Sequence, residues 1–377
     1  MFIKSGTLRW QDAVEPTLRC ATDALVRPFI AARCDGDSFY LRHNWRKVLA
    51  AGARLHVVDR EFGCAGHNPF VGPFAYGHEC VAEVLSCGAQ VQNFSPGDVV
   101  IVPWGISCGE CPTCGVGLTA KCEAARDQNP TAAFGFGRAF GVHGGMVSDL
   151  LRVPWADAML VAVPPGVDPL TVASASDNLT DGYRTVAPHL SRNPGAPVLV
   201  VGGGAKSIGL YAAGVARALG SSRVDYVDSC PTRLAMAARL GANPVELAPH
   251  AGWFRKGRPP LSGGYSISVD ASSTTRGLTF ALEALAPGGV CTGVGFYLRS
   301  GTPLPLWGMY LKCATLHVGL ASARTHLPAL LELIRQGGLD PTIVTSLVAD
   351  WKDAPSALLE RTTKVVLRRE PLKQRAA

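Results

Sequence analysis

The chain has 377 residues, of which 47% are hydrophobic, and it carries 36 Lys and Arg against 29 Asp and Glu. This length predicts two domains, each able to bury its own core. The positive charges are scattered, and we interpret their densest run, residues 361–375, as a last strand with a solvated tail. This distribution of charge gives little support to a role in nucleic-acid binding. Apolar runs stay well short of the roughly 20 residues that span a bilayer, so we expect a soluble, cytoplasmic protein without membrane association.

The first part of the chain, up to about residue 165, consists of short apolar runs broken by Gly, Pro and Asn. The clearest runs are residues 23–32, 79–88, 97–105 and 159–166. Short strands with turn residues between them are typical of an antiparallel, β-rich domain with long loops.

The pattern changes at residues 197–228, which predict a strand, a glycine turn, a helix and a second strand, that is, one βαβ unit. Helical and strand patterns then alternate through residues 234–245, 265–272 and 277–295, as a parallel sheet requires. A helix over residues 326–338 and a final strand over 363–369 complete the chain. The fold class is therefore α/β.

A cysteine cluster stands in the run CGECPTCGVGLTAKC, with thiols at Cys108, Cys111, Cys114 and Cys122. The alternatives are unpaired cysteines or a disulfide scaffold. A disulfide scaffold is disfavoured because no secretory segment is evident at MFIKSGTLRW and the chain is long enough to fold without disulfide cross-links. Four thiolates fill a tetrahedral zinc site and leave no position open for water. The cluster therefore predicts a structural zinc ion in a reducing compartment.

The glycine turn after the strand at 198–201 is irregular, since it is about two residues longer than the standard GxGxxG fingerprint. Glycines allow backbone amides to approach a pyrophosphate, and a helix from about Ser207 would present its positive N-terminus to that group. Lys206 is either a pyrophosphate contact or a solvated loop charge. The residues predicted to bind the cofactor here are Gly202, Gly204, Lys206, Ser207, Ile208 and Gly209.

Asp228 ends the second strand, in the usual place for a carboxylate that binds the ribose of a dinucleotide. A carboxylate there repels a 2′-phosphate, so NAD is favoured over NADP, although Arg233 lies close enough to weaken that preference. The alternative role of Asp228 is to cap the next helix.

Together these residues resemble the zinc-dependent medium-chain alcohol dehydrogenases, in the branch of glutathione-independent formaldehyde dehydrogenases and the threonine and polyol dehydrogenases. The resemblance rests on GHECVAEVLSCG, the following GDVV, the four-cysteine lobe, the βαβ unit with Asp228 and the closing KVVL. It implies a GroES-like catalytic domain formed by residues 1–177 and 319–377. A Rossmann domain, a doubly wound parallel sheet, is expected over residues 178–318.

The resemblance also implies a second, catalytic zinc ion with three protein ligands. Cys34 comes from the CDGD turn, His78 from GHE, and Asp177 from SDNLTDGYRTV. Each has an ordinary alternative, namely a buried apolar thiol, a core histidine and a helix cap. The expected total is two zinc ions per chain.

Two acidic residues complete the implied catalytic set. Asp37 is expected to accept a hydrogen bond from the second imidazole nitrogen of His78 and so fix its tautomer. Glu79 is expected close to the zinc ion, and its alternative role is that of a carboxylate bonded within the fold.

The implied reaction is hydride transfer between NAD(H) and an alcohol, aldehyde or ketone. Relatives usually carry Ser or Thr two positions after the first cysteine to start a proton relay, whereas this chain has Gly36. Ser38, Tyr40, His43 or a water molecule would have to replace that hydroxyl. Two alternatives therefore stay open: a zinc-independent reductase of a conjugated C=C or an imine, and a catalytically silent NAD(H)-binding or scaffold protein.

The stretch between Cys34 and His78 is about twice as long as in most relatives. Its Trp45, Arg46, His56 and His67 are candidates for shaping substrate specificity, or the stretch packs against another subunit. The resemblance further implies a small-molecule substrate and a homodimer or homotetramer, because the Rossmann sheet often pairs across a two-fold axis in this family.

Overall fold

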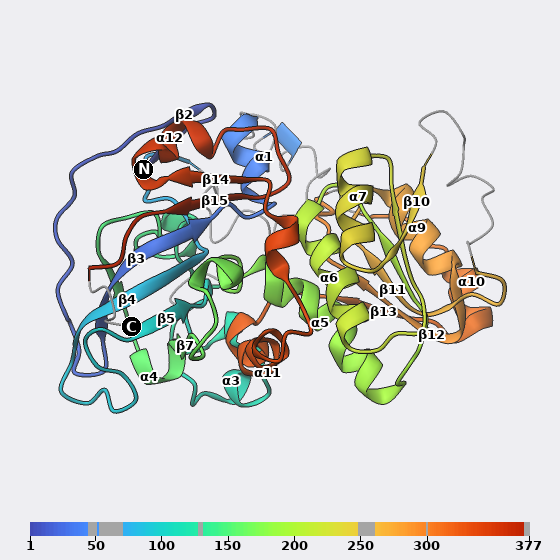
Figure 1. Ribbon diagram of the computed structural model, residues 1–377, viewed down its shortest axis with the longest axis horizontal. Coiled ribbons are helices and arrows are strands. Elements are labelled where there is room, and N and C mark those ends of the chain that lie inside the picture. The colour runs from blue at the N-terminus through green and yellow to red at the C-terminus, as the bar shows by residue number, and fades with distance from the viewer. Residues whose placement is uncertain (44–50, 53–70, 127–130, 248–260, 299–300, 373–377) are drawn as a thin grey trace. The chain divides into compact units, whose positions relative to one another are not determined.

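The computed structural model describes residues 1–43, 51–52, 71–126, 131–247, 261–298 and 301–372. Within them the chain forms two compact units (Figure 1). Unit 1 comprises Met1–Thr180, Ser322–Glu332 and Thr345–Ala377, and unit 2 comprises Asp181–Ala321 and Leu333–Val344. Trp45, Arg46, His56 and His67 lie outside the described residues.

Unit 1 is built on a seven-stranded sheet in the order β14-β15-β3-β4-β5-β7, with β6 paired to β3. The strands are β3 (Ala24–Ala32), β4 (Cys80–Cys87), β5 (Val99–Val102), β6 (Leu151–Val153), β7 (Val161–Ala162), β14 (Leu347–Asp350) and β15 (Val365–Arg368). All neighbours pair antiparallel except β14 and β15, which are parallel. The predicted antiparallel, β-rich domain is therefore confirmed.

Shorter elements surround this sheet. They are β1 (Phe2–Lys4), β2 (Thr7–Leu8), α1 (Asp37–Arg42), α3 (Pro112–Gly115), α4 (Ala156–Met159), α11 (Ala323–Arg335) and α12 (Ala354–Ala357). One apolar core extends from the first strand through β3, β4 and β5 to β15. Strands β3 and β4 are central and lie beside each other. The residues directly after β3 and directly before β4 are therefore held in fixed positions.

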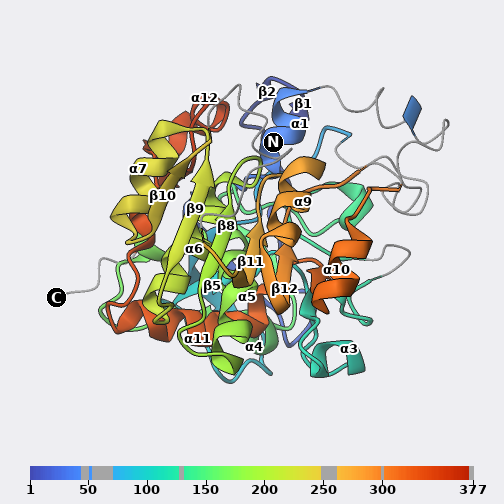
Figure 2. The ribbon, with the colours of Figure 1, turned by 90° about the vertical axis from the view of Figure 1, so that its right-hand side faces the viewer.

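Unit 2 is a six-stranded parallel sheet in the order β10-β9-β8-β11-β12-β13. The strands are β8 (Val198–Val201), β9 (Val224–Asp228), β10 (Asn243–Glu246), β11 (Tyr265–Asp270), β12 (Leu285–Gly293) and β13 (Thr315–Val318). In chain order this is 3-2-1-4-5-6, the Rossmann order, in which the direction of strand addition reverses between β8 and β11 (Figure 2). The predicted doubly wound sheet is confirmed.

Helices cover this sheet. They are α5 (Asn178–Arg192), α6 (Lys206–Ala218), α7 (Pro231–Arg239), α9 (Thr275–Glu283) and α10 (Leu306–Lys312). Helix α6 packs on β8 and β9, helix α7 on β9 and β10, and helix α9 on β8, β11 and β12. In the part of the chain that the structure describes, every helix is too short or too polar to cross a membrane.

Candidate metal sites and nucleotide-binding turn

Three side chains meet at the ends of two central strands and the start of a helix in unit 1. Cys34 follows β3, His78 precedes β4, and Asp177 directly precedes α5. The antiparallel pairing of Ala31 with Cys80 brings the end of β3 beside the start of β4. The sheet register therefore places Cys34 next to His78 although 44 positions separate them in the chain.

The three donor atoms lie within 4.8 Å of one another. The Sγ atom of Cys34 is 3.1 Å from Oδ2 of Asp177, and Nε2 of His78 is 3.4 Å from the same oxygen. A thiol, an imidazole and a carboxylate at these separations are a donor set that zinc accepts, and three protein ligands leave a position for a substrate oxygen or water.

The His78 ring supplies an independent test of whether an ion fits here. The residue is 1% exposed, yet neither ring nitrogen has a hydrogen-bond partner among the residues that the structure describes. One of the two nitrogens of a neutral imidazole always carries a lone pair, and leaving it buried without a partner costs about 1–3 kcal/mol. A cation between His78 and Asp177 would satisfy that lone pair, so the residues fit a bound metal ion.

Without an ion, the electrostatics of this cluster favour a protonated Cys34 and a protonated His78, whereas the pKa of Asp177 is lowered because its contacts with His78 and Cys34 outweigh the opposite effect of burial. Burial raises the pKa of Cys34 well above its ordinary value, and the Asp177 carboxylate raises it further. Burial lowers the pKa of His78, but Asp37 and Asp177 outweigh this effect and leave it raised. A divalent cation reverses this balance, because it favours the thiolate and the neutral imidazole.

Asp37 opens α1 and is fully buried. Its Oδ1 accepts a hydrogen bond from the Tyr40 hydroxyl at 2.7 Å, and its Oδ2 accepts one from the Tyr76 hydroxyl at 2.6 Å. Burial and Asp37 raise the pKa of both tyrosines well above the ordinary value, so the hydroxyls stay protonated and donate.

The expected hydrogen bond from His78 to Asp37 is not formed, because Nδ1 and Oδ1 are 3.7 Å apart and the tyrosines engage both carboxylate oxygens. The same contact occupies the Tyr40 hydroxyl, one of the candidates to replace the relay hydroxyl missing at Gly36. Ser38 and His43, the other two, are partly buried and exposed, respectively.

Glu79, between His78 and β4, bonds two other residues of unit 1. Its Oε2 lies 2.6 Å from Nζ of Lys364, and its Oε1 accepts the Asn178 backbone N–H at 2.8 Å. Burial raises the pKa of Glu79 to about 7, although Lys364 opposes the shift. In this structure Glu79 is thus bonded within the fold, and it also interacts electrostatically with Cys34, His78 and Asp177, so its expected place close to the ion stays a prediction.

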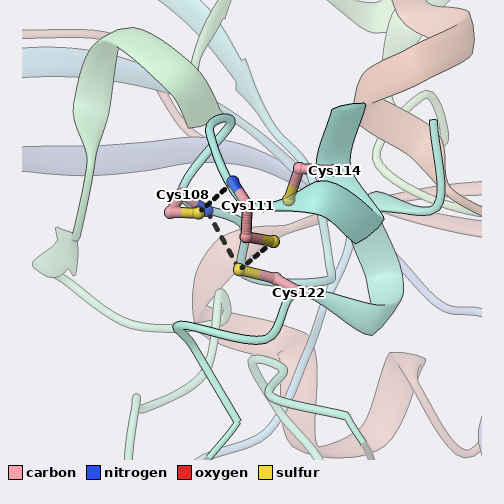
Figure 3. A group of neighbouring side chains, drawn as sticks. All are labelled: Cys108, Cys111, Cys114 and Cys122. Carbon is pink, nitrogen blue, oxygen red and sulfur yellow. Dashed lines mark hydrogen bonds between the residues drawn. The ribbon is translucent and has the colours of Figure 1, made fainter. Parts of the chain in front are cut away.

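The four cysteines of the lobe also gather at one point, with their sulfur atoms within 4.8 Å of one another (Figure 3). Backbone N–H groups donate to three of the sulfurs: Cys108 N–H to Cys122 at 3.2 Å, Cys111 N–H to Cys108 at 3.4 Å, and Glu123 N–H to Cys111 at 3.4 Å. Such bonds, led by that of the Cys114 backbone, lower the pKa of Cys111 to about 6. Burial raises the pKa of Cys114 to about 12 and also raises that of Cys122, so the feature of the lobe that fits a structural zinc site is the convergence of its four sulfurs.

The glycine turn in unit 2 follows β8, at the point where strand addition reverses. Helix α6 begins at Lys206, one residue before the predicted Ser207, and Ile208 and Gly209 lie in its first turn. A Cβ on Gly203, whose φ is +152°, would come 2.8 Å from the Ser272 Cα atom, and one on Gly204 would meet Ser273 Oγ at 2.6 Å. The glycines therefore permit close packing against the loop after β11.

Asp228 ends β9 and is 1% exposed. Its carboxylate accepts two hydrogen bonds from Arg233, each at 2.7 Å, one from the Tyr226 hydroxyl and one from the Cys230 backbone N–H. A Cβ on Gly202 would approach its Oδ2 to 2.5 Å. Asp228 thus lies beside the glycine turn, as a ribose ligand would, and also bonds the start of α7, as a cap would.

Two residues with a place in the inner cluster escaped the sequence analysis, namely Asn178 and Lys364. Lys364 was placed in the final strand without a role, and it is fully buried and paired with Glu79. The available signals were an amide directly after Asp177 and a lone lysine at the start of the apolar run VVL.

Comparisons with known proteins agree with this arrangement. Residues 22–165 match the alcohol dehydrogenase GroES-like domain, and residues 207–336 match the zinc-binding dehydrogenase domain. A "Probable zinc-binding alcohol dehydrogenase" of Mycobacterium tuberculosis is 32% identical over 77% of this chain and 70% of its own length. A glutathione-independent formaldehyde dehydrogenase of Pseudomonas aeruginosa is 34% identical over 46% of this chain and 43% of its own.

Among solved structures, an alcohol dehydrogenase of Thermus sp. ATN1 superposes with a TM-score of 0.80 at 28% identity. The superposition covers 97% of this chain and 98% of that one, so the likeness extends over both units.

Proposed function

Since the chain belongs to the family of zinc-dependent medium-chain alcohol dehydrogenases, we propose that it transfers a hydride between NAD(H) and an alcohol, aldehyde or ketone. The observation that carries this proposal is the convergence of one donor atom each from Cys34, His78 and Asp177 within 4.8 Å, with no hydrogen-bond partner for the His78 ring among the described residues. These three side chains would hold the catalytic zinc ion. When bound, the ion polarises the substrate oxygen and lowers the pKa of an alcohol, so that hydride loss becomes feasible near neutral pH.

The protein's own residues prepare this site. Asp37, fixed by its two tyrosines, places negative charge 3.7 Å from Nδ1 of His78. The Phe136 ring stacks on His78 at 4.3 Å between centroids and forms an apolar wall beside the cluster. We propose that Ser38, His43 or water carries the substrate proton away, since Gly36 has no hydroxyl and Tyr40 donates to Asp37.

A second zinc ion, held by the four cysteines, has a structural role in the proposal. The described cysteines are all free thiols, which agrees with a reducing, cytoplasmic location. The four ligands leave no open position, so this ion stabilises the lobe without taking part in the reaction.

For the cofactor we propose NAD, with NADP used less well. The support is the Asp228 carboxylate beside the glycine turn, which would bind ribose hydroxyls and repel a 2′-phosphate. Arg233 pairs with both carboxylate oxygens and reduces their net charge, so we expect a moderate preference.

We also propose that the protein is a homodimer or homotetramer. Strand β13 is the last in the sheet order, and helix α10 beside β12 exposes four large apolar side chains. The exposed fractions are 65% for Leu306, 71% for Trp307, 74% for Tyr310 and 63% for Leu311. A second copy related by a two-fold axis could extend the sheet at β13 and cover this helix.

The proposed reaction is tested by measuring alcohol-dependent reduction of NAD with a panel of primary, secondary and polyhydric alcohols. We expect activity with at least one class and its loss when a chelator removes the inner ion. Reduction of a conjugated C=C or an imine that survives removal of that ion would instead support the reductase alternative, which Gly36 favours. Tight NAD(H) binding with no turnover on either panel would support the silent scaffold.

A further inference from the structure

Asn178 directly follows Asp177 and is fully buried at the start of α5. Its side-chain amide donates to Sγ of Cys34 at 3.1 Å and to Oδ2 of Asp177 at 3.1 Å. Both N–H groups of one amide thus reach two of the three predicted zinc ligands, on the same atoms that would bind the ion.

The other half of the same amide is anchored just as firmly. Oδ1 of Asn178 accepts the Asp35 backbone N–H at 3.0 Å and the Lys364 ammonium at 2.8 Å. These two partners are donors only, and the two partners of Nδ2 are acceptors when the ligands are charged. The amide therefore has one orientation that satisfies its surroundings. In the reverse orientation its NH₂ group would face the two donors and its oxygen would face the two acceptors.

Lys364 holds the oxygen end of this amide, away from the two ligands. It is fully buried at the start of β15, and its Nζ also lies 2.6 Å from Oε2 of Glu79. The remaining Glu79 oxygen accepts the Asn178 backbone N–H. A buried ammonium needs such compensation, and the closed set of contacts leaves Asn178 little freedom to rotate.

These contacts suit a group that prepares a metal site. Without an ion, the Cys34 thiol donates to Oδ2 of Asp177 at 3.1 Å. Binding of an ion would displace that proton and leave two anionic ligands side by side, and an amide that donates to both lowers their repulsion. Each donated bond also occupies a lone pair, so the remaining lone pairs are directed in space. A residue with a purely structural role at a helix start would bond backbone groups, whereas both amide N–H groups here go to ligand atoms.

We propose that Asn178, held by Lys364, is a positioning residue that orients Cys34 and Asp177 for the inner zinc ion. This inference rests on the proposed function, because it requires that ion. Asn178 does not touch the substrate, and its effect is on the affinity and geometry of the metal site. Removal of such a partner typically weakens metal affinity about 10- to 100-fold.

The test compares Asn178→Asp and Asn178→Ala with the wild-type chain. Asn178→Asp keeps the shape and the acceptors but loses both N–H donors, and Asn178→Ala loses the whole amide while retaining the backbone N–H to Glu79. The matched control is Thr180→Val, which removes a buried hydroxyl that donates to the Asp177 backbone carbonyl at 2.7 Å without touching a ligand side chain.

The readout is zinc retained per chain during titration with a chromophoric chelator, with the four-cysteine ion as an internal reference. In both Asn178 variants, we expect the chelator concentration that releases the inner ion to be at least about 10-fold lower than in the wild type. In Thr180→Val, we expect that concentration to be unchanged. Cobalt placed in the inner site, with zinc kept in the lobe, should show an altered thiolate-to-metal charge-transfer band in both Asn178 variants. If Asn178→Ala does not fold, Asn178→Asp decides alone.

The outcomes separate the two proposals. Two zinc ions in the wild-type chain, with wild-type affinity and spectrum in both Asn178 variants, overturn the positioning role and leave the proposed function standing. One zinc ion in the wild-type chain overturns both. Two ions in the wild-type chain and selective loss of the inner ion in the Asn178 variants support both.

Discussion

His78 shows at the scale of one residue why the inner cluster is more than a set of buried polar groups. Its neighbours Asp37 and Asp177 are near but do not bond its ring nitrogens. Proteins rarely leave buried nitrogens without partners, and exceptions of this kind point to a bound ion or water that completes the site. His78 is therefore the single residue that gives the proposed metal ion its most direct support.

Asp228 is expected to set the cofactor preference. In Asp228→Ala the repelling carboxylate is lost and Arg233 is freed from its two 2.7 Å bonds, so a 2′-phosphate gains a cation. We expect the ratio of kcat/KM for NAD to that for NADP to fall about 10-fold or more. Arg239→Ala, an exposed arginine on the same helix, is the control and should leave the ratio unchanged. An unchanged ratio in Asp228→Ala would show that another residue selects the cofactor.

The residues of the inner cluster could be predicted from the sequence in part. CDGD, GHE and SDNL are local patterns, so Cys34, His78 and Asp177 were identifiable, and the structure brings the three together. The partner of Glu79 was not identifiable, because Lys364 lies 285 positions away and only the pairing of distant strands buries it. The contact of Tyr76 with Asp37 was not identifiable for the same reason, since 39 positions separate them, whereas Tyr40 lies only three positions from Asp37.

At the scale of elements, the turn between β8 and α6 depends on glycine for two reasons. Gly203 has a φ of +152°, which side chains rarely adopt, and the loop after β11 leaves no room for a Cβ. The backbone N–H of Gly204 donates a hydrogen bond to the Ser272 carbonyl, and that of Ala205 donates one to the Ala271 carbonyl, so the turn is bonded to the loop after β11. The irregular spacing of this turn is thus explained by packing within the protein as well as by any cofactor.

Gly203→Ala is therefore expected to destabilise unit 2 by about 1–3 kcal/mol, because a strained backbone is combined with a close contact to Ser272. Thermal unfolding and NADH fluorescence titration would both measure the effect, as a lower Tm and weaker binding. Gly319→Ala, where a Cβ has open space, is the matched control and should change neither. Wild-type stability in Gly203→Ala would mean that the turn adopts a different conformation.

The contact between α5 and the sheet of unit 2 should depend on pH. Burial, followed by His317 and Arg192, lowers the pKa of His189 to about 4, and its Nε2 lies 3.3 Å from Thr292 Oγ1. The folded pKa is below the unfolded value of about 6.5. The neutral form is therefore favoured in the folded state, and its stabilisation is present above pH 6.5 and lost as the pH falls towards 4.

We expect the Tm of the wild-type chain to fall across this window, and to fall less in His189→Gln, which cannot be protonated. Because the ring is partly exposed, the difference should be small. Hydrogen exchange at α5 and β13, measured at both ends of the window, locates the effect. Equal slopes in the two proteins would contradict the assignment to His189.

Element order and type followed from periodicity, because long runs such as VLVV and LAMAARL carry a clear strand or helix pattern. Boundaries followed less well, as the start of α6 at Lys206 shows. The parallel pairing of β14 with β15 was not foreseen, since β14 is short and only alternately buried. The stretch with Trp45, Arg46, His56 and His67 lies outside the described residues, so its predicted role in specificity stays a prediction.

At the scale of the whole molecule, the exposed apolar side chains of α10 give the proposed dimer a direct test. A charge at the centre of an apolar interface removes a large contact and leaves an unpaired ion, so Trp307→Glu should raise the dimer Kd about 30-fold or more. Sedimentation velocity over a range of concentrations measures this shift. Val116→Glu, at a 74% exposed apolar residue of unit 1, should leave it unchanged. A wild-type Kd in Trp307→Glu would place the interface elsewhere.

The two proposed zinc sites differ in the way that structural and catalytic sites should differ. The lobe offers four sulfurs and no open position, whereas the inner cluster offers three mixed donors beside the aromatic ring of Phe136. The central claim is that one chain holds both ions, each in its own site, and that only the inner one serves hydride transfer.

The measurement that tests this claim most directly is zinc per chain, by elemental analysis, in the wild-type protein, in His78→Ala and in Cys114→Ser, all purified without chelators. The account predicts about two ions in the wild type and about one in each variant, with alcohol-dependent NAD reduction lost in His78→Ala. A single ion in the wild type, or the same zinc content in His78→Ala as in the wild type, would contradict it.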